Sequence, residues 1–332
     1  MKRRTFIFCL AGTAAAGLAG LRLSRPGVPS HMVKVSRKGF ALGTQVSLTV
    51  FHPDEKEANA ALDAAFAELD KVEDIMSLYR PESQISQLNK AGSLSNPHAY
   101  LVEVLETSRN LSSATNGAFD VTIQPLWRLH FEHSQKGTVA TAEEIEKALA
   151  LVDYRQLTIS REKVQLGRSG QAVSLNGIAQ GFAADRVAAV LKAHGVESAL
   201  IDTGEFGAIG THAEKDSWSV GIKHPREQEA LMGVAPLKGM CLATSGDYET
   251  RFSEDYRHHH LLDPQTGYSP EELSSVSVIA DSAMQADALS TAVFLLGLDK
   301  GRAMIEERPG VEAVFVTKDG REIRTDGFPS IS

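Results

Sequence analysis

Asp287 and Thr291 stand four residues apart in the apolar segment 282–297, SAMQADALSTAVFLLG. Residues at this spacing share one face of an α-helix. Ser282 is a typical N-cap and Gly297 a typical helix-ending residue, and the small or apolar residues between them predict a largely buried helix. A buried carboxylate is costly unless a cation or hydrogen-bond donors compensate it. Two hard oxygens one turn apart suit Mg²⁺ better than a soft metal.

A second interpretation of this helix needs no metal. Asp287 would lie in the first turn, where the helix dipole favours a negative charge, and Thr291 would bond back to a backbone carbonyl. The segment alone leaves both interpretations open.

A glycine turn is predicted within residues 172–186, AVSLNGIAQGFAADR. The pattern indicates a strand, a turn through Gly177 and Gly181, and a helix that continues to His194. Free amides at the start of such a helix form a general anion site. The spacing is neither GxGxxG nor GK[ST], the two common phosphate fingerprints. Tight turns alone would also explain these glycines.

The densest polar region covers residues 242–267. Its polar groups are Thr244, Ser245, Asp247, the three histidines at 258–260, Asp263 and Thr266. A histidine beside a carboxylate could be a general base or a phosphate contact. The alternative is a β-hairpin that turns at 263–267 and leaves the histidines exposed at its edge.

Two further places offer ligand-binding side chains. Tyr79, in a polar loop before a short helix, could stack on a planar ligand while Ser83 and Asn89 hold polar atoms. The alternative is a tyrosine packed at a helix end, with Ser83 as the next N-cap. Asp120 and Thr122 lie two residues apart, and therefore on one side of the chain if it is extended there.

Hydrophobic periodicity predicts the elements that position these groups. Strands are expected at 44–51, 199–202, 218–222, 311–316 and 322–325, and helices at 55–76, 100–113, from 141 onward, and at 301–307. His130 and His133 fall in a polar stretch that we expect to be an exposed loop, where two histidines alone do not define a metal site. Strands and helices alternate without an internal repeat or long linker, which indicates one compact body.

Composition and the first residues restrict the class of protein. The chain has 332 residues and a formal net charge of −8 with scattered acidic residues, which argues against nucleic acid as a partner. Residues 1–30 resemble a bacterial twin-arginine signal peptide, with Arg3-Arg4 before a short Ala- and Gly-rich apolar run. The run is too short for a permanent membrane anchor, and Cys9 is misplaced for lipidation. We therefore expect a soluble periplasmic protein after cleavage.

The order of these motifs resembles the ApbE family of flavin transferases, which move FMN from FAD onto a Thr or Ser of another protein. The resemblance covers about residues 36–328. The motifs that carry it are, in chain order, Leu42-Gly43-Thr44; Met76-Ser77-x-Tyr79-x-x-x-Ser83-x-Ile85-x-x-Leu88-Asn89; Gly117-x-Phe119-Asp120-x-Thr122; Gly177-Ile178-Ala179-x-Gly181-Phe182-x-x-Asp185; Ser245-Gly246-Asp247-Tyr248; His259-His260-x-Leu262-Asp263-Pro264-x-Thr266-Gly267; and Ala286-Asp287-Ala288-x-x-Thr291. It implies an α+β fold: a single ApbE-like (T-fold-like) body of interleaved mixed sheets and helices, with the flavin site in a central cleft.

The resemblance also implies roles for individual residues. Mg²⁺ would be held by Asp287, Thr291 and the backbone carbonyl of Ala179. The family's histidine falls on His260, with Asp247 as its candidate partner in catalysis. The residues implied to contact FAD are Tyr79, Asp120, Thr122, Gly177, Ala179, Gly181, Asp185, Ser245 and Thr266. The implied reaction is phosphoryl transfer, in which an acceptor hydroxyl attacks the FMN-side phosphorus and AMP leaves.

The chain departs from the family pattern at two points. Gln180 stands where the family usually has Lys, and Glu205-Phe206 follow Gly204 where the family has a second Gly and then Asp. Loss of a cation beside a pyrophosphate and gain of a carboxylate would weaken phosphate binding or shift its pH dependence.

The signal peptide without a lipidation Cys looks like the NosX branch, linked to nitrous oxide respiration. There the acceptor would be NosR, a membrane-bound flavoprotein facing the periplasm. The alternatives are a Mg²⁺-dependent FAD pyrophosphatase, a non-catalytic periplasmic FAD carrier, and a metal-binding module built on the histidines at 258–260.

Overall fold

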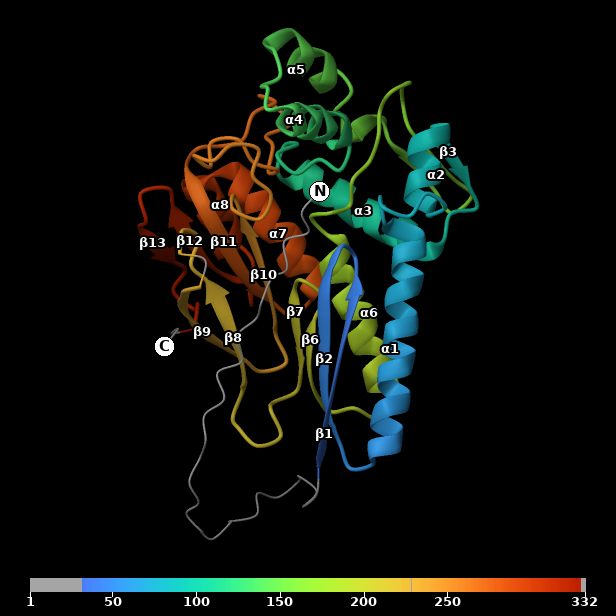
Figure 1. Ribbon diagram of the computed structural model, residues 1–332, viewed down its shortest axis with the longest axis vertical. Coiled ribbons are helices and arrows are strands. Elements are labelled where there is room, and N and C mark those ends of the chain that lie inside the picture. Colours follow the sequence, from blue (N-terminus) through green and yellow to red (C-terminus); the bar gives the residue numbers. More distant parts are fainter. Residues whose placement is uncertain (1–31, 228, 330–332) are drawn as a thin grey trace. The chain divides into compact units, whose positions relative to one another are not determined.

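The structure, a computed structural model, describes residues 32–227 and 229–329, and these residues fall in one compact unit. Its largest sheet has eight strands in the order β1-β2-β6-β7-β10-β11-β12-β13, each antiparallel to its neighbours (Figure 1). The strands are β1 (Val33–Ala41), β2 (Thr44–His52), β6 (Ser198–Asp202), β7 (Phe206–Ile209), β10 (Cys241–Gly246), β11 (Leu273–Ala280), β12 (Glu312–Thr317) and β13 (Glu322–Arg324).

A row of helices covers one face of this sheet in the same order as the strands. α1 packs on β1 and β2, α6 on β6 and β7, α7 on β10 and β11, and α8 on β12, while each helix also packs on the next in the row. The helices of the described chain are α1 (Glu55–Met76), α2 (Gln84–Ala91), α3 (Ala99–Ala114), α4 (Gln124–Lys136), α5 (Ala142–Leu149), α6 (Ala179–Ala193), α7 (Ala283–Leu296) and α8 (Leu298–Glu306), with a short 3-10 turn at Tyr154–Gln156. The main apolar core lies between this row and the sheet.

The other face of the sheet is covered by the hairpin of β8 (Trp218–Lys223) and β9 (Leu231–Leu237). Trp218 and Val220 of this hairpin pack with Phe51 of β2 and Leu242 of β10 in a second apolar cluster. The middle of the sheet is therefore buried on both faces, which explains why every residue of β11 is buried.

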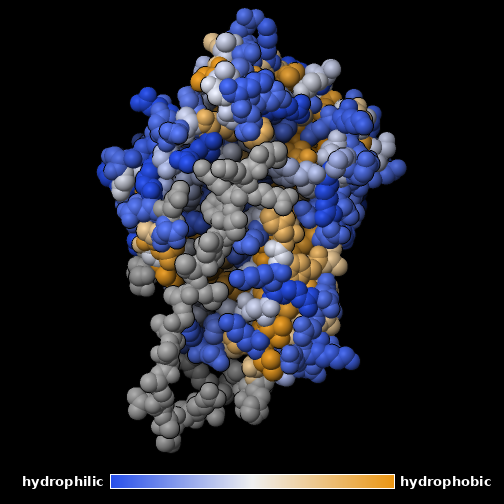
Figure 2. Space-filling view, in the orientation of Figure 1, coloured by the Kyte–Doolittle hydropathy of each residue, from blue (hydrophilic) through white to orange (hydrophobic). Residues whose placement is uncertain are grey.

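A third sheet is formed by β3 (Ser93–Ser95), β5 (Lys163–Gln165) and β4 (Thr158–Ile159), and it lies beside α2 and α3. Figure 2 shows a face that is mostly hydrophilic, with apolar side chains exposed over β1 and β2. None of the helices among the described residues is both long enough and apolar enough to span a membrane.

Most of the predicted elements are confirmed. α1 has the predicted bounds, α3 and α7 agree within a residue or two, and β12 and β13 form the expected hairpin. The strand predicted at 44–51 from its alternating pattern is confirmed as β2, whereas β1 was not predicted. β1 joins β2 through a tight turn at Leu42 and Gly43, both with positive φ, as such hairpins require.

Three local predictions are wrong. The polar stretch with His130 and His133 is helix α4, in which His130 is buried, because Pro125 in the first turn starts a helix. Residues 117–123 and 172–176 are loops that meet at a single bridge between Ile123 and Ala172. Residues 263–267 form the turn of the hairpin alternative, with Gly267 N donating to Asp263 O at 2.8 Å, but no hairpin flanks it. The predicted signal peptide, Cys9 included, lies outside the described residues.

Candidate active site

Asp287 lies inside α7 with only 4% of its surface exposed. Ser282 caps the helix, and Asp287 comes four residues after Ala283, the first helical residue. It therefore lies beyond the first turn, and the metal-free interpretation based on the helix dipole does not hold. Its Oδ2 accepts a hydrogen bond of 2.9 Å from the amide of Gly181, while no described residue donates to its Oδ1. Burial raises the pKa of this carboxyl from 3.8 to about 7.

The glycines of the predicted turn are required by close packing against α7. A Cβ on Gly181 would lie 2.2 Å from the carbonyl oxygen of Ala283 and 2.7 Å from the Cβ of Asp287. A Cβ on Gly177 would lie 3.0 Å from Oγ1 of Thr291. The turn at the start of α6 therefore packs closely against the face of α7 that carries Asp287 and Thr291, two of the predicted metal ligands. Ala179, the third, is the first residue of α6.

Hydroxyl groups from β10 and α7 adjoin Asp287. Oγ of Ser245, near the end of β10, lies 2.8 Å from Oγ of Ser290 and 3.0 Å from Oγ1 of Thr291. The partner of Thr291 is thus a hydroxyl rather than the backbone carbonyl of the metal-free interpretation. The structure therefore gathers three of the predicted residues, Ser245, Asp287 and Thr291, around the turn at Gly177 and Gly181.

Glu205 also belongs to this site, although the sequence marked it only as a departure from a pattern. It lies in the turn between β6 and β7, 9% exposed, and its Oε2 accepts a hydrogen bond of 3.1 Å from the amide of Thr244. The turn is fixed to the start of α6, because Thr203 donates to the backbone oxygen of Gln180 at 3.0 Å. Burial, and next the negative charge of Asp287, raise the pKa of Glu205 well above its usual value.

The donor set fits a hard divalent cation. Within residues 32–227 and 229–329, neither Asp287 nor Glu205 forms an ion pair with a basic side chain. Two buried acids without a cation are unfavourable, and carboxylate and hydroxyl oxygens are the ligands that Mg²⁺ prefers. No group of three or more His, Cys, Asp or Glu side chains suited to a metal occurs in the described part of the chain, so the histidine metal module is not supported.

The predicted pairing of Asp247 with His260 is corrected by the structure. Asp247 is fully buried, and both its oxygens accept hydrogen bonds of 2.8 Å from the guanidinium of Arg226. The ammonium of Lys318 lies 2.9 Å from Oδ2. Because Arg226 and Lys318 already form ion pairs with this carboxylate, Asp247 anchors the segment after β10 and does not hold the imidazole of His260.

His260 keeps the properties of a proton acceptor. Its side chain is half-buried, and its Nδ1 is buried without a hydrogen-bond partner among the described residues. Burial lowers its pKa below 6.5, so the ring is neutral at pH 7. His259 is fully buried and its Nε2 lies 3.2 Å from the Pro270 oxygen, so the prediction of edge-exposed histidines is wrong for this residue.

Asp120 and Thr122, predicted to contact FAD, join two loops in the structure. Asp120 accepts from the amide and hydroxyl of Thr122, at 2.8 and 2.6 Å, and from the amide of Tyr154 at 2.9 Å. The hydroxyl of Thr122 also accepts from the amide of Asp153 at 2.8 Å. These bonds hold the two loops together, and the FAD contact predicted for both residues stays a prediction.

Asp185 and Thr266 also form bonds within the protein, and their predicted contact with FAD stays a prediction. Asp185, on α6, accepts from the hydroxyl of Ser282 at 2.6 Å and from the amides of Ala283 and Met284 at 2.8 and 3.0 Å. It therefore satisfies the free amides at the start of α7. Thr266 donates to Oδ2 of Asp263 at 3.1 Å and closes the turn there.

Tyr79 is 70% exposed, so the alternative of a packed tyrosine is wrong. Its ring adjoins the turn between β1 and β2, where a Cβ on Gly43 would lie 3.6 Å from Cε2. Ser83 is the N-cap of α2, as that same alternative predicted. Asn89 bonds the backbone of Val173 through both side-chain atoms, at 2.7 and 2.8 Å, and is not free to hold a ligand.

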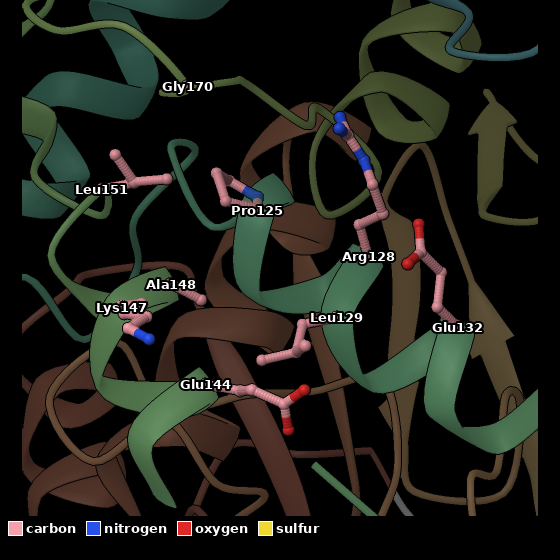
Figure 3. Close-up of a pocket in the computed structure, with 9 residues that line it drawn as sticks. All are labelled: Pro125, Arg128, Leu129, Glu132, Glu144, Lys147, Ala148, Leu151 and Gly170. Carbon is pink, nitrogen blue, oxygen red and sulfur yellow. The ribbon is translucent and has the colours of Figure 1, made fainter. Parts of the chain in front are cut away.

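A separate pocket of about 310 Å³ opens between α4 and α5 (Figure 3). Its charged lining residues are Arg128, Glu132, Glu144 and Lys147, and none of the predicted site residues lines it. Glu144 forms the predicted capping box with Thr141. The pocket therefore does not belong to the site at Asp287.

The fold and this site define an α+β protein with an acidic, hydroxyl-rich centre between two helices and the end of a β-strand. The chain belongs to the ApbE family, whose profile matches residues 42–315. It is 32% identical over 314 residues to a protein of Treponema pallidum named FAD:protein FMN transferase, covering 86% of this chain and 85% of that one.

Solved structures agree with this assignment. The ApbE protein of Thermotoga maritima is similar with a TM-score of 0.80 at 29% identity, covering 89% of this chain and 98% of that one. The flavinyl transferase ApbE of Pseudomonas stutzeri is similar with a TM-score of 0.77 at 32% identity, covering 89% and 94%. The predicted mixed α+β fold is thus confirmed.

Proposed function

We propose that this chain is an FAD:protein FMN transferase that transfers FMN from FAD to a Thr or Ser hydroxyl of an acceptor protein and requires Mg²⁺. The observation that carries the proposal is the buried, unpaired carboxylate of Asp287, held by Gly181 beside the hydroxyls of Thr291 and Ser245. The named relatives, which match most of the chain, support the same activity.

Asp287, Thr291 and the backbone carbonyl of Ala179 would hold Mg²⁺. When bound, the ion neutralises negative charge on the pyrophosphate and on the AMP leaving group. The amides of Ala179 and Gly181 at the start of α6 already donate to Leu175 O and to Asp287 Oδ2, so they do not form the free-amide anion site predicted for this turn. The exposed ring of Tyr79 is available to stack on the isoalloxazine.

The reaction exchanges the phosphoanhydride bond of FAD for a phosphoester bond to the acceptor. The acceptor oxygen forms a bond to the FMN-side phosphorus, the bond from that phosphorus to the bridging oxygen breaks, and AMP leaves with the electron pair. The hydroxyl proton goes to His260, which is neutral at pH 7 because burial lowers its pKa. Asp247 takes no part in this step, because Arg226 and Lys318 already hold it.

The test combines purified protein, FAD, Mg²⁺ and a candidate acceptor domain, and measures the acceptor by intact mass spectrometry. The expected result is an acceptor heavier by one FMN, lost with Asp287→Ala and kept with Asp299→Ala, an exposed carboxylate on α8. AMP release without any acceptor would instead identify an FAD pyrophosphatase. Bound FAD that is never cleaved would identify a carrier.

The compartment and the acceptor are a separate part of the proposal. The Arg3-Arg4 pair and the absence of a suitably placed lipidation Cys support export by the twin-arginine route to the periplasm and a soluble mature protein. A membrane-bound flavoprotein such as NosR would then be the acceptor, as in the NosX branch. Replacing both arginines with Lys should retain the protein in the cytoplasm, as measured by fractionation and immunoblotting. Unchanged export would contradict this route.

A further inference from the structure

Glu205 is more than nine-tenths buried but has little to stabilise its charge. The amide of Thr244 donates to Oε2, and no donor to Oε1 occurs among the described residues. A carboxylate usually needs two or three such donors, or a cation, to remain ionised in a protein interior. Its position is fixed, because Gly204 has a φ of +99° and turns the chain so that Glu205 precedes the first residue of β7.

Glu205 and Asp287 contact adjacent residues of β10 and of the start of α6. Thr244, which donates to Glu205, is followed by Ser245, whose hydroxyl contacts Thr291 on the same face of α7 as Asp287. Gln180, next to the Gly181 that donates to Asp287, packs against the Glu205 turn: a Cβ on Gly204 would lie 2.7 Å from its Nε2. The electrostatic influence of Asp287 on Glu205 agrees with this arrangement.

The side chain next to the Glu205 turn is that of Gln180, which is uncharged. A Lys at position 180 would lie beside the Glu205 turn and could neutralise its carboxylate. Gln180 carries no charge, so the two acids have a combined charge of −2 when ionised and no basic partner in the described chain. A single divalent ion would balance that charge, and protein Mg²⁺ sites commonly use one or two carboxylates.

We propose that Glu205 is an additional ligand of the cation site at Asp287, so that this chain binds a divalent ion before FAD is present. The inference rests on the proposed transferase site, and it adds a carboxylate that the ligand set of Asp287, Thr291 and Ala179 does not include. A site with two protein carboxylates depends less on phosphate oxygens to complete its coordination.

The test is a titration of the nucleotide-free full chain with Mn²⁺, in which the signal of free Mn²⁺ is measured by electron paramagnetic resonance and Mg²⁺ is added as a competitor. The wild type is expected to bind one ion that Mg²⁺ displaces. Glu205→Gln keeps an acceptor for Thr244 and should weaken binding at least tenfold. Glu143→Gln is the matched control, because Glu143 is exposed on α5 and pairs with Lys147, and the affinity of this variant should not change.

A second variant leaves Glu205 in place. Gln180→Lys puts a cation beside the same turn, and it should also weaken Mn²⁺ binding at least tenfold. Circular dichroism of each variant shows whether it is folded. Wild-type affinity in both variants, or no Mn²⁺ binding by the nucleotide-free wild type, would overturn the inference. FMN transfer by the wild type that is lost in Asp287→Ala would still support the proposed function, so the two failures are distinguishable.

Discussion

Replacing Asp287 with Asn should stabilise the metal-free protein, and the gain should grow with pH. Burial raises the pKa of the Asp287 carboxyl from 3.8 to about 7, so the folded protein holds this proton more tightly than the unfolded chain does. The stability linked to this group is therefore complete below about pH 4 and is lost as the pH rises through the folded pKa. Asn cannot ionise, and its side-chain oxygen can still accept from Gly181.

The size of the change in the free energy of unfolding follows from the shift in the pKa of Asp287. One pKa unit corresponds to about 1.4 kcal/mol, so the move from 3.8 to about 7 lowers the free energy of unfolding by about 4 kcal/mol once Asp287 is ionised. More than half of this loss falls between pH 5 and pH 8. Glu205 acts in the same direction, because its pKa is also raised by burial and by Asp287.

The assay is urea unfolding followed by circular dichroism, with a chelator present, at one-unit steps from pH 5 to pH 8. Asp287→Asn should gain stability relative to the wild type by about 2 to 3 kcal/mol over this range, and Asp299→Asn, the exposed control, should not. Adding Mg²⁺ should then stabilise the wild type but not Asp287→Asn. A difference between wild type and Asp287→Asn that stays constant with pH would refute the claim that this carboxylate is desolvated in the fold.

Three other predictions concern the helices and the flavin site. Tyr79→Ala should weaken FAD binding about tenfold in a fluorescence titration, with an unchanged melting temperature because the ring is 70% exposed; unchanged affinity would exclude stacking. Asp185→Ala should lower the free energy of unfolding by about 2 kcal/mol in urea, because it removes the acceptor for the start of α7; a wild-type midpoint would contradict that role. Gly181→Ala should cost at least about 3 kcal/mol, because its Cβ would lie 2.2 Å from the Ala283 oxygen. Gly207→Ala, whose Cβ would meet nothing closer than 3.8 Å, should change stability by less than about 1 kcal/mol, and equal effects of the two would contradict the close-packing argument.

The parts of the fold that were predicted are those with a local signal. α1 and α7 have caps and a clear apolar pattern, and the hydroxyl and carboxylate of Thr291 and Asp287 share a face because helix geometry requires it. β1 was missed because it follows the signal peptide and has mainly polar residues on its exposed side. α4 was missed because its polar, histidine-containing sequence resembles a loop.

The parts of the site that were not predicted depend on residues far apart in the sequence. Asp247 pairs with Arg226, which is 21 residues before it, and with Lys318, which is 71 residues after it. No helix or strand periodicity relates residues this far apart. The same is true of Glu205, which reaches the site only because the turn between β6 and β7 packs on the start of α6. A charged residue at an unexpected motif position was the one signal that could have identified it.

The contact between α6 and α7 has a consequence for how such an enzyme can diversify. Gly181 and Asp185, one turn apart on α6, both bond to α7. A substitution that separates α6 from α7 would therefore lower both the affinity for the ion and the stability of the fold. Altered recognition of acceptor proteins is easier to obtain elsewhere. The largely exposed stretch 253–257, in the loop after β10, contains no helix or strand, so it can vary in length and sequence while the paired helices keep their geometry.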